Sequence, residues 1–146
     1  MERILDWNKY LDTAAKMVSE GIVMLKNDNN ALPLDTDKEV AVFGRIQFHY
    51  YKSGTGSGGM VNVTKVVNIL DGLIDNGIKV NEKLLGTYRK WDKENPFDLG
   101  EGWGGEPWSQ KEMPLDEGLV KETAKSCETA IVIIGRTAGE EQDNRL

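Results

Sequence analysis

The stretch that most constrains the fold is the last seventeen residues, 130–146, which read AIVIIGRTAGEEQDNRL. They begin with an apolar run, pass a glycine at position 135, and continue into a polar segment that contains Glu140 and Glu141. A continuous apolar run closed by a glycine predicts a strand buried on both faces, which is typical of parallel sheets. Ligand sites of open α/β sheets lie in the loops beyond the carboxyl ends of such strands. The pattern therefore places two carboxylates where a site is expected.

The rest of the chain alternates between strand and helix patterns. Residues 38–44 (KEVAVFG) have the β-forming residues and closing glycine of a second buried strand. Apolar spacing and capping residues predict further helices at 8–20, 65–76 (capped by Thr64), 82–90 and 117–127 (capped by Asp116), and short strands at 22–26 and 78–80. This order predicts an α/β fold with a mostly parallel sheet flanked by helices.

Parallel strands would bring two distant loops together. If strands 39–44 and 130–135 run in the same direction, their trailing loops lie at the same edge of the sheet. Residues 54–59 and 139–144 would then be neighbours, although about 80 residues separate them in the sequence.

The first of these loops is rich in glycine. Gly54, Gly56 and Gly59 match the G-x-G-x-x-G dinucleotide fingerprint, and Glu82 follows at a spacing that suits ribose binding. However, nine residues separate Gly44 from Gly54, whereas a true fingerprint follows its strand directly. The alternatives are a flexible loop, or a loop whose glycines let the backbone, Thr55 and Ser57 approach a polar ligand closely.

The two glutamates of the second loop also allow two interpretations. Adjacent loop residues do not easily point the same way, so we expect one functional carboxylate at most. The alternative is a solvated acidic loop paired with Arg136 or Arg145.

A third feature is the segment 91–115, which contains three tryptophans, three prolines and four glycines without periodicity. Loops of this length are uncommon in compact domains and are usually functional or disordered. Its tryptophans suit either stacking on a sugar or partner, or packing of the loop onto its own domain, with Trp103 and Trp108 as the anchors. The lone His49 is expected to be a loop or packing residue, Cys127 is expected to be a small buried residue at a helix end, and no metal site is predicted.

Composition excludes several classes of protein. A chain of 146 residues has the size of about one domain, and its net charge of −6 and pI near 4.9 argue against nucleic acid and anionic membrane partners. The sequence contains no signal peptide pattern and no apolar run of membrane-spanning length. With its single cysteine, the composition predicts a cytoplasmic protein.

Four motifs together resemble glycoside hydrolase family 3, the β-glucosidase family. They are AAKMVSEGIVMLKNDNNALPL at 14–34, EVAVFG at 39–44, GTGSGG at 54–59 and IVIIGRTAGEEQDN at 131–144. They occur in the order found in the family and cover most of the chain except 86–115. The resemblance is to the α/β-sandwich domain of the family and not to its TIM barrel.

The resemblance implies a retaining β-glucosidase that cleaves terminal non-reducing β-glycosidic bonds with two carboxylates and no cofactor. The family's acid/base glutamate stands in a Ser-Gly-Glu-Gly type motif, here Thr137-Ala138-Gly139-Glu140-Glu141. Glu140 is therefore the matched catalytic residue, and Glu141 takes the place of a glycine. Ser57, with Thr55 and Gly56 of the same loop, is expected to bind the carbohydrate substrate.

The family's nucleophile is an aspartate of the barrel, for which this chain offers no counterpart. We therefore expect residues 1–146 to be the N-terminal portion of a sandwich domain in a protein of reversed domain order, to partner a barrel that this chain lacks, and to be inactive alone. The open edge of a partial sheet also predicts association between copies. The alternative is a non-catalytic α/β module that binds a nucleotide or sugar at the same sheet edge.

Overall fold

The computed structural model describes residues 5–52, 55–59 and 61–140, and the chain divides into two units, Met1–Leu34 and Asp35–Leu146. The first unit contains helix α1 (Trp7–Gly21), which begins where the Asp6 side chain accepts a hydrogen bond from the Lys9 backbone amide at 3.1 Å. The predicted helix at 8–20 is confirmed. The predicted strand at 22–26 is wrong, because these residues pair with no strand in the described part of the chain.

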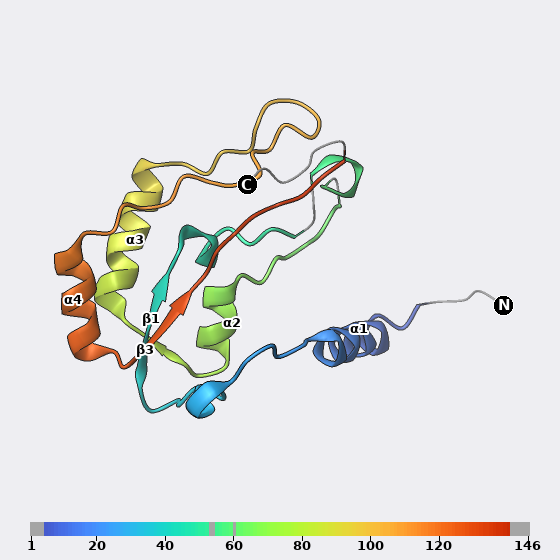
Figure 1. The fold of residues 1–146 in the computed structure, drawn as a ribbon. Coiled ribbons are helices and arrows are strands. Elements are labelled where there is room, and N and C mark those ends of the chain that lie inside the picture. The colour runs from blue at the N-terminus through green and yellow to red at the C-terminus, as the bar shows by residue number, and fades with distance from the viewer. Residues whose placement is uncertain (1–4, 53–54, 60, 141–146) are drawn as a thin grey trace. The chain divides into compact units, whose positions relative to one another are not determined.

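The second unit is built on a parallel sheet of three strands (Figure 1). Strand β1 (Glu39–Phe43) lies in the middle, between β2 (Lys79–Val80) and β3 (Thr129–Val132). The register sets Ala41 beside Ala130 and Phe43 beside Val132. The predicted α/β fold with a parallel sheet and flanking helices is confirmed.

Three helices accompany the sheet, with α3 (Glu82–Glu94) and α4 (Glu117–Ser126) on one side and α2 (Ile69–Asp75) on the other (Figure 1). Asp116 caps α4 as predicted. Helix α2 is shorter than predicted, because the Asn68 side chain, and not Thr64, accepts the capping bond from the Asp71 amide at 2.7 Å. Helix α3 runs past the predicted end at residue 90, so the loop that follows is shorter and spans residues 95–116. We call this loop the excursion.

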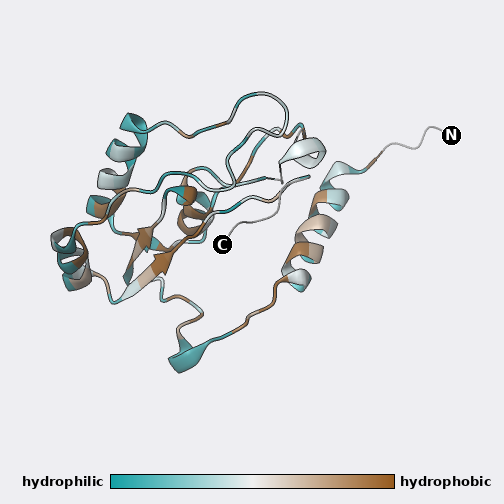
Figure 2. Ribbon diagram, turned by 45° about the horizontal axis from the view of Figure 1, so that its top comes forward, coloured by the Kyte–Doolittle hydropathy of each residue, from teal (hydrophilic) through white to brown (hydrophobic). Residues whose placement is uncertain are grey.

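The core lies mainly between β1 and the pair α3–α4. Ala41 and Phe43 pack there with a cluster that comprises Leu84, Tyr88, Met113 and Cys127. Val40 and Val42 alternate with them and are equally buried, so β1 is covered on both faces, as its sequence predicts. Figure 2 shows hydrophobic residues along the strands and a mixture of hydrophobic and hydrophilic residues along the helices. Cys127 is a buried packing residue at the end of α4, which confirms its predicted role.

Strand β3 departs from its prediction. It was expected to be buried on both faces, but Val132 is 68% exposed and Ile134, just beyond the strand, is 78% exposed. The physical reason is position: β3 is one of the two edge strands of the described sheet, and the face that carries Ala130 and Val132 is exposed. An apolar run indicates that a strand is suited to burial, but it does not indicate which elements cover that strand. None of the helices that the structure describes is long and apolar enough to cross a lipid bilayer.

Candidate active site

The glycine loop and the segment after β3 meet at one edge of the sheet. The Thr55 amide donates a hydrogen bond to the Ala138 carbonyl at 2.9 Å, and Thr55 forms a parallel bridge with Gly139. The two segments continue the parallel pairing of β1 with β3, which explains their contact. The prediction that these loops are neighbours is confirmed for their described residues.

Two glycines make this close approach feasible. A Cβ on Gly139 would overlap the Thr55 hydroxyl, so no larger residue fits there without moving the loop. Gly56 has a φ of +84°, which side chains disfavour, and a Cβ at this position would lie 3.0 Å from Glu140 Oε2. The glycines therefore allow the backbone of one loop to rest against the carboxylate of the other.

Ser57 and Glu140 form the polar contact at the centre of the site. The Ser57 hydroxyl donates a short hydrogen bond to Glu140 Oε1, and the Ser57 amide donates to Oε2 at 3.3 Å. Bonds to a charged carboxylate favour its ionised form, so the hydroxyl first and the amide second hold the pKa of Glu140 below its ordinary value. The result is an exposed, oriented carboxylate that can exchange a proton with a bound molecule.

The predicted site residues have different surroundings. Ser57 and Glu140 are exposed, whereas Thr55 is buried and its hydroxyl faces Gly139. Glu141 lies outside the described residues, as do Arg145 and Gly54. Arg136, the other cation considered as a partner for the glutamates, lies over the Trp108 ring at 4.7 Å. The geometry thus brings Ser57, Gly56 and Glu140 together and places Thr55 beneath them.

The excursion forms a wall beside this site. The Trp108 carbonyl accepts a hydrogen bond from the Thr137 amide at 2.9 Å, which ties the excursion to the segment that carries Glu140. Further along, a Cβ on Gly104 would lie 3.7 Å from the Gly56 backbone. Trp108 therefore anchors the loop, as one of the two interpretations predicted, but Trp103 does not, because it is 64% exposed.

Arg45 binds the excursion to the end of α3. This residue was not identified from the sequence. Its side chain is 1% exposed, and its guanidinium donates to Asp92 Oδ1 at 2.8 Å and to the carbonyls of Asn95 and Lys111 at 2.7 and 3.0 Å. The guanidinium also lies over the rings of Trp91 and Phe97, at 5.0 and 5.5 Å from their centroids. The sequence signal for this role is the position of Arg45, a charged residue directly after a predicted buried strand. A buried arginine requires partners, so this position indicates a network around its guanidinium.

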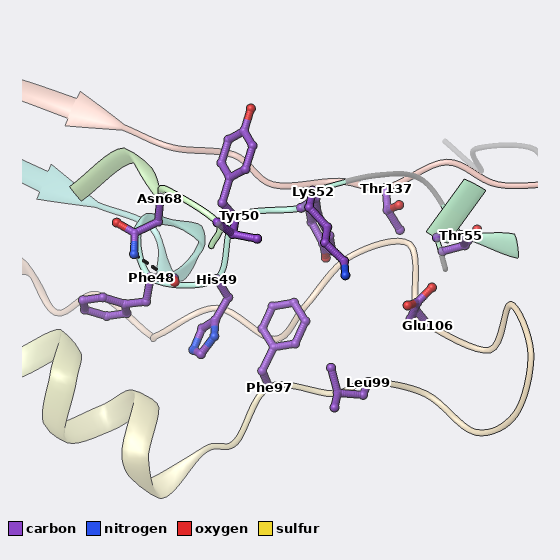
Figure 3. Close-up of a pocket in the computed structure, with 13 residues that line it drawn as sticks. Phe48, His49, Tyr50, Lys52, Thr55, Asn68, Phe97, Leu99, Glu106 and Thr137 are labelled. Atoms are coloured by element: carbon purple, nitrogen blue, oxygen red, sulfur yellow. Dashed lines mark hydrogen bonds between the residues drawn. The ribbon is translucent and has the colours of Figure 1, made fainter. Parts of the chain in front are cut away.

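His49 extends the same network toward a cavity of about 330 Å³. Its Nε2 lies 2.8 Å from Asp92 Oδ2, and the centroid of its ring lies 4.8 Å from that of Phe97. Figure 3 shows His49 and Phe97 on one side of this cavity, with Thr55 and Glu106 at the other end. The prediction that His49 is a packing residue is confirmed. Within residues 5–52, 55–59 and 61–140, no group of three His, Cys, Asp or Glu side chains could hold a metal ion.

The glycine loop lacks the structural context of a dinucleotide fingerprint. In that motif the glycines lead directly into a helix, whose N-terminus binds the pyrophosphate. Here Gly56–Gly59 form a 3-10 turn, and the chain runs without helix from Val61 to Asn68 before α2 begins. Glu82, whose spacing would suit ribose binding, is the first residue of α3. The loop geometry favours close contact with Glu140 over a nucleotide role.

Comparison with known proteins identifies the family of this α/β unit. Residues 22–145 match the glycosyl hydrolase family 3 C-terminal domain, and the chain belongs to this family of glycoside hydrolases. It is 64% identical over 140 residues to a β-glucosidase of Ruminococcus albus and 33% identical over 147 residues to β-glucosidase A of Butyrivibrio fibrisolvens. These matches cover 96% and 99% of the chain, but only 15% and 17% of the relatives.

Solved structures show the same fold. A β-glucosidase of Paenibacillus barengoltzii matches 98% of the chain and 15% of its own length, with a TM-score of 0.88 and 52% identity. β-Glucosidase 3B of Thermotoga neapolitana, solved in complex with glucose, matches 96% of the chain and 19% of its own length, with a TM-score of 0.81 and 29% identity. The chain thus spans about a sixth of the length of the curated relatives.

Proposed function

We propose that this chain is part of a retaining, β-glucosidase-like hydrolase that cleaves terminal non-reducing β-glycosidic bonds, and that Glu140 is its acid/base. The observation that carries the proposal is the contact of Ser57 with Glu140, at the sheet edge where the sequence motifs place them. The relatives named β-glucosidase support a carbohydrate substrate. We further propose that the nucleophile lies in a barrel domain of the same protein, and that the protein is cytoplasmic.

The proposed reaction has two steps. In the first, a carboxylate outside this chain attacks the anomeric carbon while protonated Glu140 gives its proton to the departing glycosidic oxygen. In the second, Glu140, now ionised, takes a proton from the water that displaces the enzyme carboxylate from the sugar. Each turnover returns both carboxylates to their initial states, and no redox step or cofactor is required.

Ser57 gives this scheme a means to adjust the acidity of Glu140. A general acid must hold a proton near neutral pH, yet the Ser57 hydroxyl keeps the pKa of Glu140 low. A hydroxyl has only one proton to donate, so a Ser57 that turns to a sugar hydroxyl releases the carboxylate. The pKa of Glu140 then rises, and the negative charge of the nucleophile raises it further. Substrate binding would thereby prepare the acid for its first proton transfer.

The test replaces Glu140 in the complete protein that contains this chain. We expect Glu140→Gln to lower kcat on β-glucosides with poor leaving groups by roughly 100-fold or more, because these need the proton. Activated leaving groups should be affected much less in the first step, and azide should restore turnover by replacing the water that needs a base. Rates on an alkyl and a dinitrophenyl β-glucoside, with and without azide, give the comparison.

Glu128→Gln is the matched control, because Glu128 is an exposed carboxylate whose partner is Lys38 at 2.6 Å, outside the site. It should leave both rates unchanged. An equal loss on both substrates in Glu140→Gln, without azide rescue, would assign Glu140 a structural role and transfer the acid/base to another residue, with Glu141 first.

A further inference from the structure

The sequence contains one asparagine that is followed by glycine, Asn76 in the pair Asn76–Gly77. The pair stands where helix α2 ends and just before strand β2 begins. The backbone nitrogen of the next residue can attack an asparagine amide, and a glycine has no side chain to obstruct that attack. This pair is therefore the position in the sequence where spontaneous loss of a side-chain amide is most favoured.

The fold itself requires a glycine after Asn76. Gly77 has a φ of +77°, a conformation that side chains disfavour. Its amide donates to the Ile74 carbonyl at 2.9 Å, and the Ile78 amide donates to the Leu73 carbonyl at 3.0 Å. These are the two bonds of a Schellman motif, which ends a helix with a glycine in the left-handed region. The reactive pair is thus a consequence of the way in which α2 ends.

The same cap occupies both groups that would react. Asn76 Nδ2 donates to the Gly72 carbonyl at 2.7 Å, and the Gly77 nitrogen is held by its bond to Ile74. Ring closure also requires the Gly77 nitrogen to turn toward the Asn76 side chain, away from the ψ of 15° that the cap imposes. The pair is exposed, and a Cβ on Gly77 would meet no described atom within 4 Å. Hydrogen bonds, and not burial, therefore restrain the reaction.

The end of α2 is suited to local opening. Leu70, near the start of this seven-residue helix, is its buried residue, whereas Ile74 in the last turn is 48% exposed. A short helix whose last turn is poorly packed opens at that end more easily than the domain unfolds. Each opening breaks the cap and releases the Asn76 side chain.

We propose that Asn76 is a site of spontaneous deamidation, restrained by the cap of α2, and that the reaction removes this cap. The Gly77 nitrogen attacks Asn76 Cγ and loses its proton as the new C–N bond forms, while the Cγ–Nδ2 bond breaks and ammonia leaves. Water then opens the cyclic imide. Attack of water at Cγ gives aspartate, and attack at the main-chain carbonyl carbon gives isoaspartate. Water is the only co-reactant, and the reaction is independent of the proposed glycosidase chemistry.

Both products weaken the cap electrostatically. Each lacks Nδ2, the donor to the Gly72 carbonyl, and each carries a negative charge in its place. The helix dipole disfavours negative charge at a C-terminus, and Asp75 already stands next to this position. The aspartate product alone therefore favours opening of the helix end.

The isoaspartate product also changes the main chain. Its backbone runs through the side-chain carbons, which adds one methylene before Gly77 and alters the spacing on which both Schellman bonds depend. Ile78 leads directly into β2, where Val80 pairs with Val40 of β1. The modification therefore loosens the connection between α2 and the sheet.

The test follows the pair in the complete protein. Trypsin releases residues 66–79, which contain both Asn76 and Asn68, so tandem mass spectrometry compares two asparagines in one peptide. Asn68 is the internal control, because the β-branched Ile69 that follows it obstructs attack. The protein is incubated in mildly alkaline heavy-oxygen water, which labels molecules that react before digestion. We expect label at Asn76 and none at Asn68; equal labelling of both, or an Asn76 that stays intact even in the isolated peptide, would overturn the site.

Leu70→Ala tests the restraint by the cap. The folded protein should react at roughly a tenth of the rate of the isolated peptide 66–79 or less, because the helix end must open first. Loss of the buried Leu70 side chain destabilises α2, so Leu70→Ala should react faster than the wild type. Leu99→Ala, which removes a 74% exposed leucine from the excursion, should keep the wild-type rate. Equal rates in the folded wild type and the peptide would overturn the restraint.

Asn76→Asp tests the consequence without the reaction, because it supplies the aspartate product directly. Hydrogen exchange at the amides of Gly77 and Ile78 should become several-fold faster, since the cap opens more often. Asn62→Asp makes the same change of charge in an exposed loop before α2 and should leave this exchange at the wild-type rate. Wild-type exchange in Asn76→Asp would show that the product preserves the cap and would overturn that part of the proposal.

Discussion

At the scale of single residues, Ser57 controls the proton affinity of Glu140. Its hydroxyl is the largest cause of the lowered pKa, and its amide is the second. Because both bonds stabilise the ionised carboxylate, removal of the hydroxyl must shift the pKa of Glu140 upward. The direction of this change in pKa therefore tests whether Glu140 is the group that titrates.

We expect Ser57→Ala in the complete protein to move the alkaline limb of the kcat/KM profile to higher pH. The protonated acid is the active form in the first step, and a higher pKa extends the pH range in which Glu140 holds its proton. The measurement is the pH dependence of kcat/KM on a phenyl β-glucoside. Ser19→Ala, which removes a hydroxyl bonded to the Ala15 carbonyl in α1, should leave the limb in place. A shift to lower pH would contradict the assignment.

Part of this arrangement could be predicted from sequence. The apolar composition of residues 39–43 and 130–135 indicated parallel strands, and parallel strands require that their trailing loops meet. The contact of the Ser57 loop with Glu140 followed from that requirement alone. The hydrogen bonds themselves could not be predicted, because they depend on the positive φ of Gly56 and on the fit of Gly139 against Thr55.

At the scale of elements, Arg45 connects the end of β1, the end of α3 and the excursion, which it contacts near both ends. One buried guanidinium satisfies Asp92 and two backbone carbonyls, while Glu112 accepts from the Arg45 amide at 3.0 Å. Removal of the arginine leaves these acceptors in a poorly solvated space. Loss of one partner of a buried pair costs about 3 kcal/mol.

We expect Arg45→Met to open the excursion locally. A cost of about 3 kcal/mol corresponds to a population of the open loop that is roughly 100-fold larger. Tryptic cleavage after Lys111, whose carbonyl loses its donor, should rise by about this factor, because cleavage follows the open population when closing is fast. Mass spectrometry of the fragments over time gives the rate.

Lys38→Met is the control for Arg45→Met, because it removes an ion pair at the surface and not a buried one. Lys38 and Glu128 are both exposed, so their ion pair contributes little and cleavage after Lys111 should stay near the wild-type rate. Equal protection of Lys111 in Arg45→Met and the wild type would show that Trp108 and Gln110 hold the excursion without Arg45.

Sequence reasoning detected elements more reliably than their surroundings. Helices α1, α3 and α4 were indicated by apolar spacing, and Asp116 by its capping position. The start of α2 was missed because Thr64 and Asn68 are both capping residues, and only the fold selects Asn68. The exposed face of β3 and the partners of Arg45 were not predicted, because both depend on residues far away in sequence.

At the scale of the whole molecule, the proposed function assigns to the described unit one half of a two-carboxylate site. A retaining glycosidase needs a second carboxylate at about 5 Å from the first. The family resemblance assigns this group to a barrel domain, and the matched relatives are about six times longer than this chain. That the sandwich precedes the barrel in the complete protein stays a prediction.

We expect residues 1–146, produced alone, not to hydrolyse 4-nitrophenyl β-glucoside, because protonation by Glu140 without a nucleophile does not complete the retaining reaction. Release of nitrophenol by the purified chain and by the complete protein, at equal molar concentration, is the measurement. Turnover that stays with the pure chain and disappears in its Glu140→Gln variant would place the nucleophile within these 146 residues.

The separate fastening of the excursion has a consequence for how such enzymes diversify. Gln110 and Asp98 close the base of the turn that carries Trp103, and none of these bonds involves Ser57 or Glu140. Substitutions at Glu101 and Trp103, the two residues of 100–105 that are not glycine, can therefore accumulate without breaking the bonds that orient Glu140. The surface of this turn and the bonds that orient Glu140 would be inherited on different segments, so related chains should vary first at these two positions.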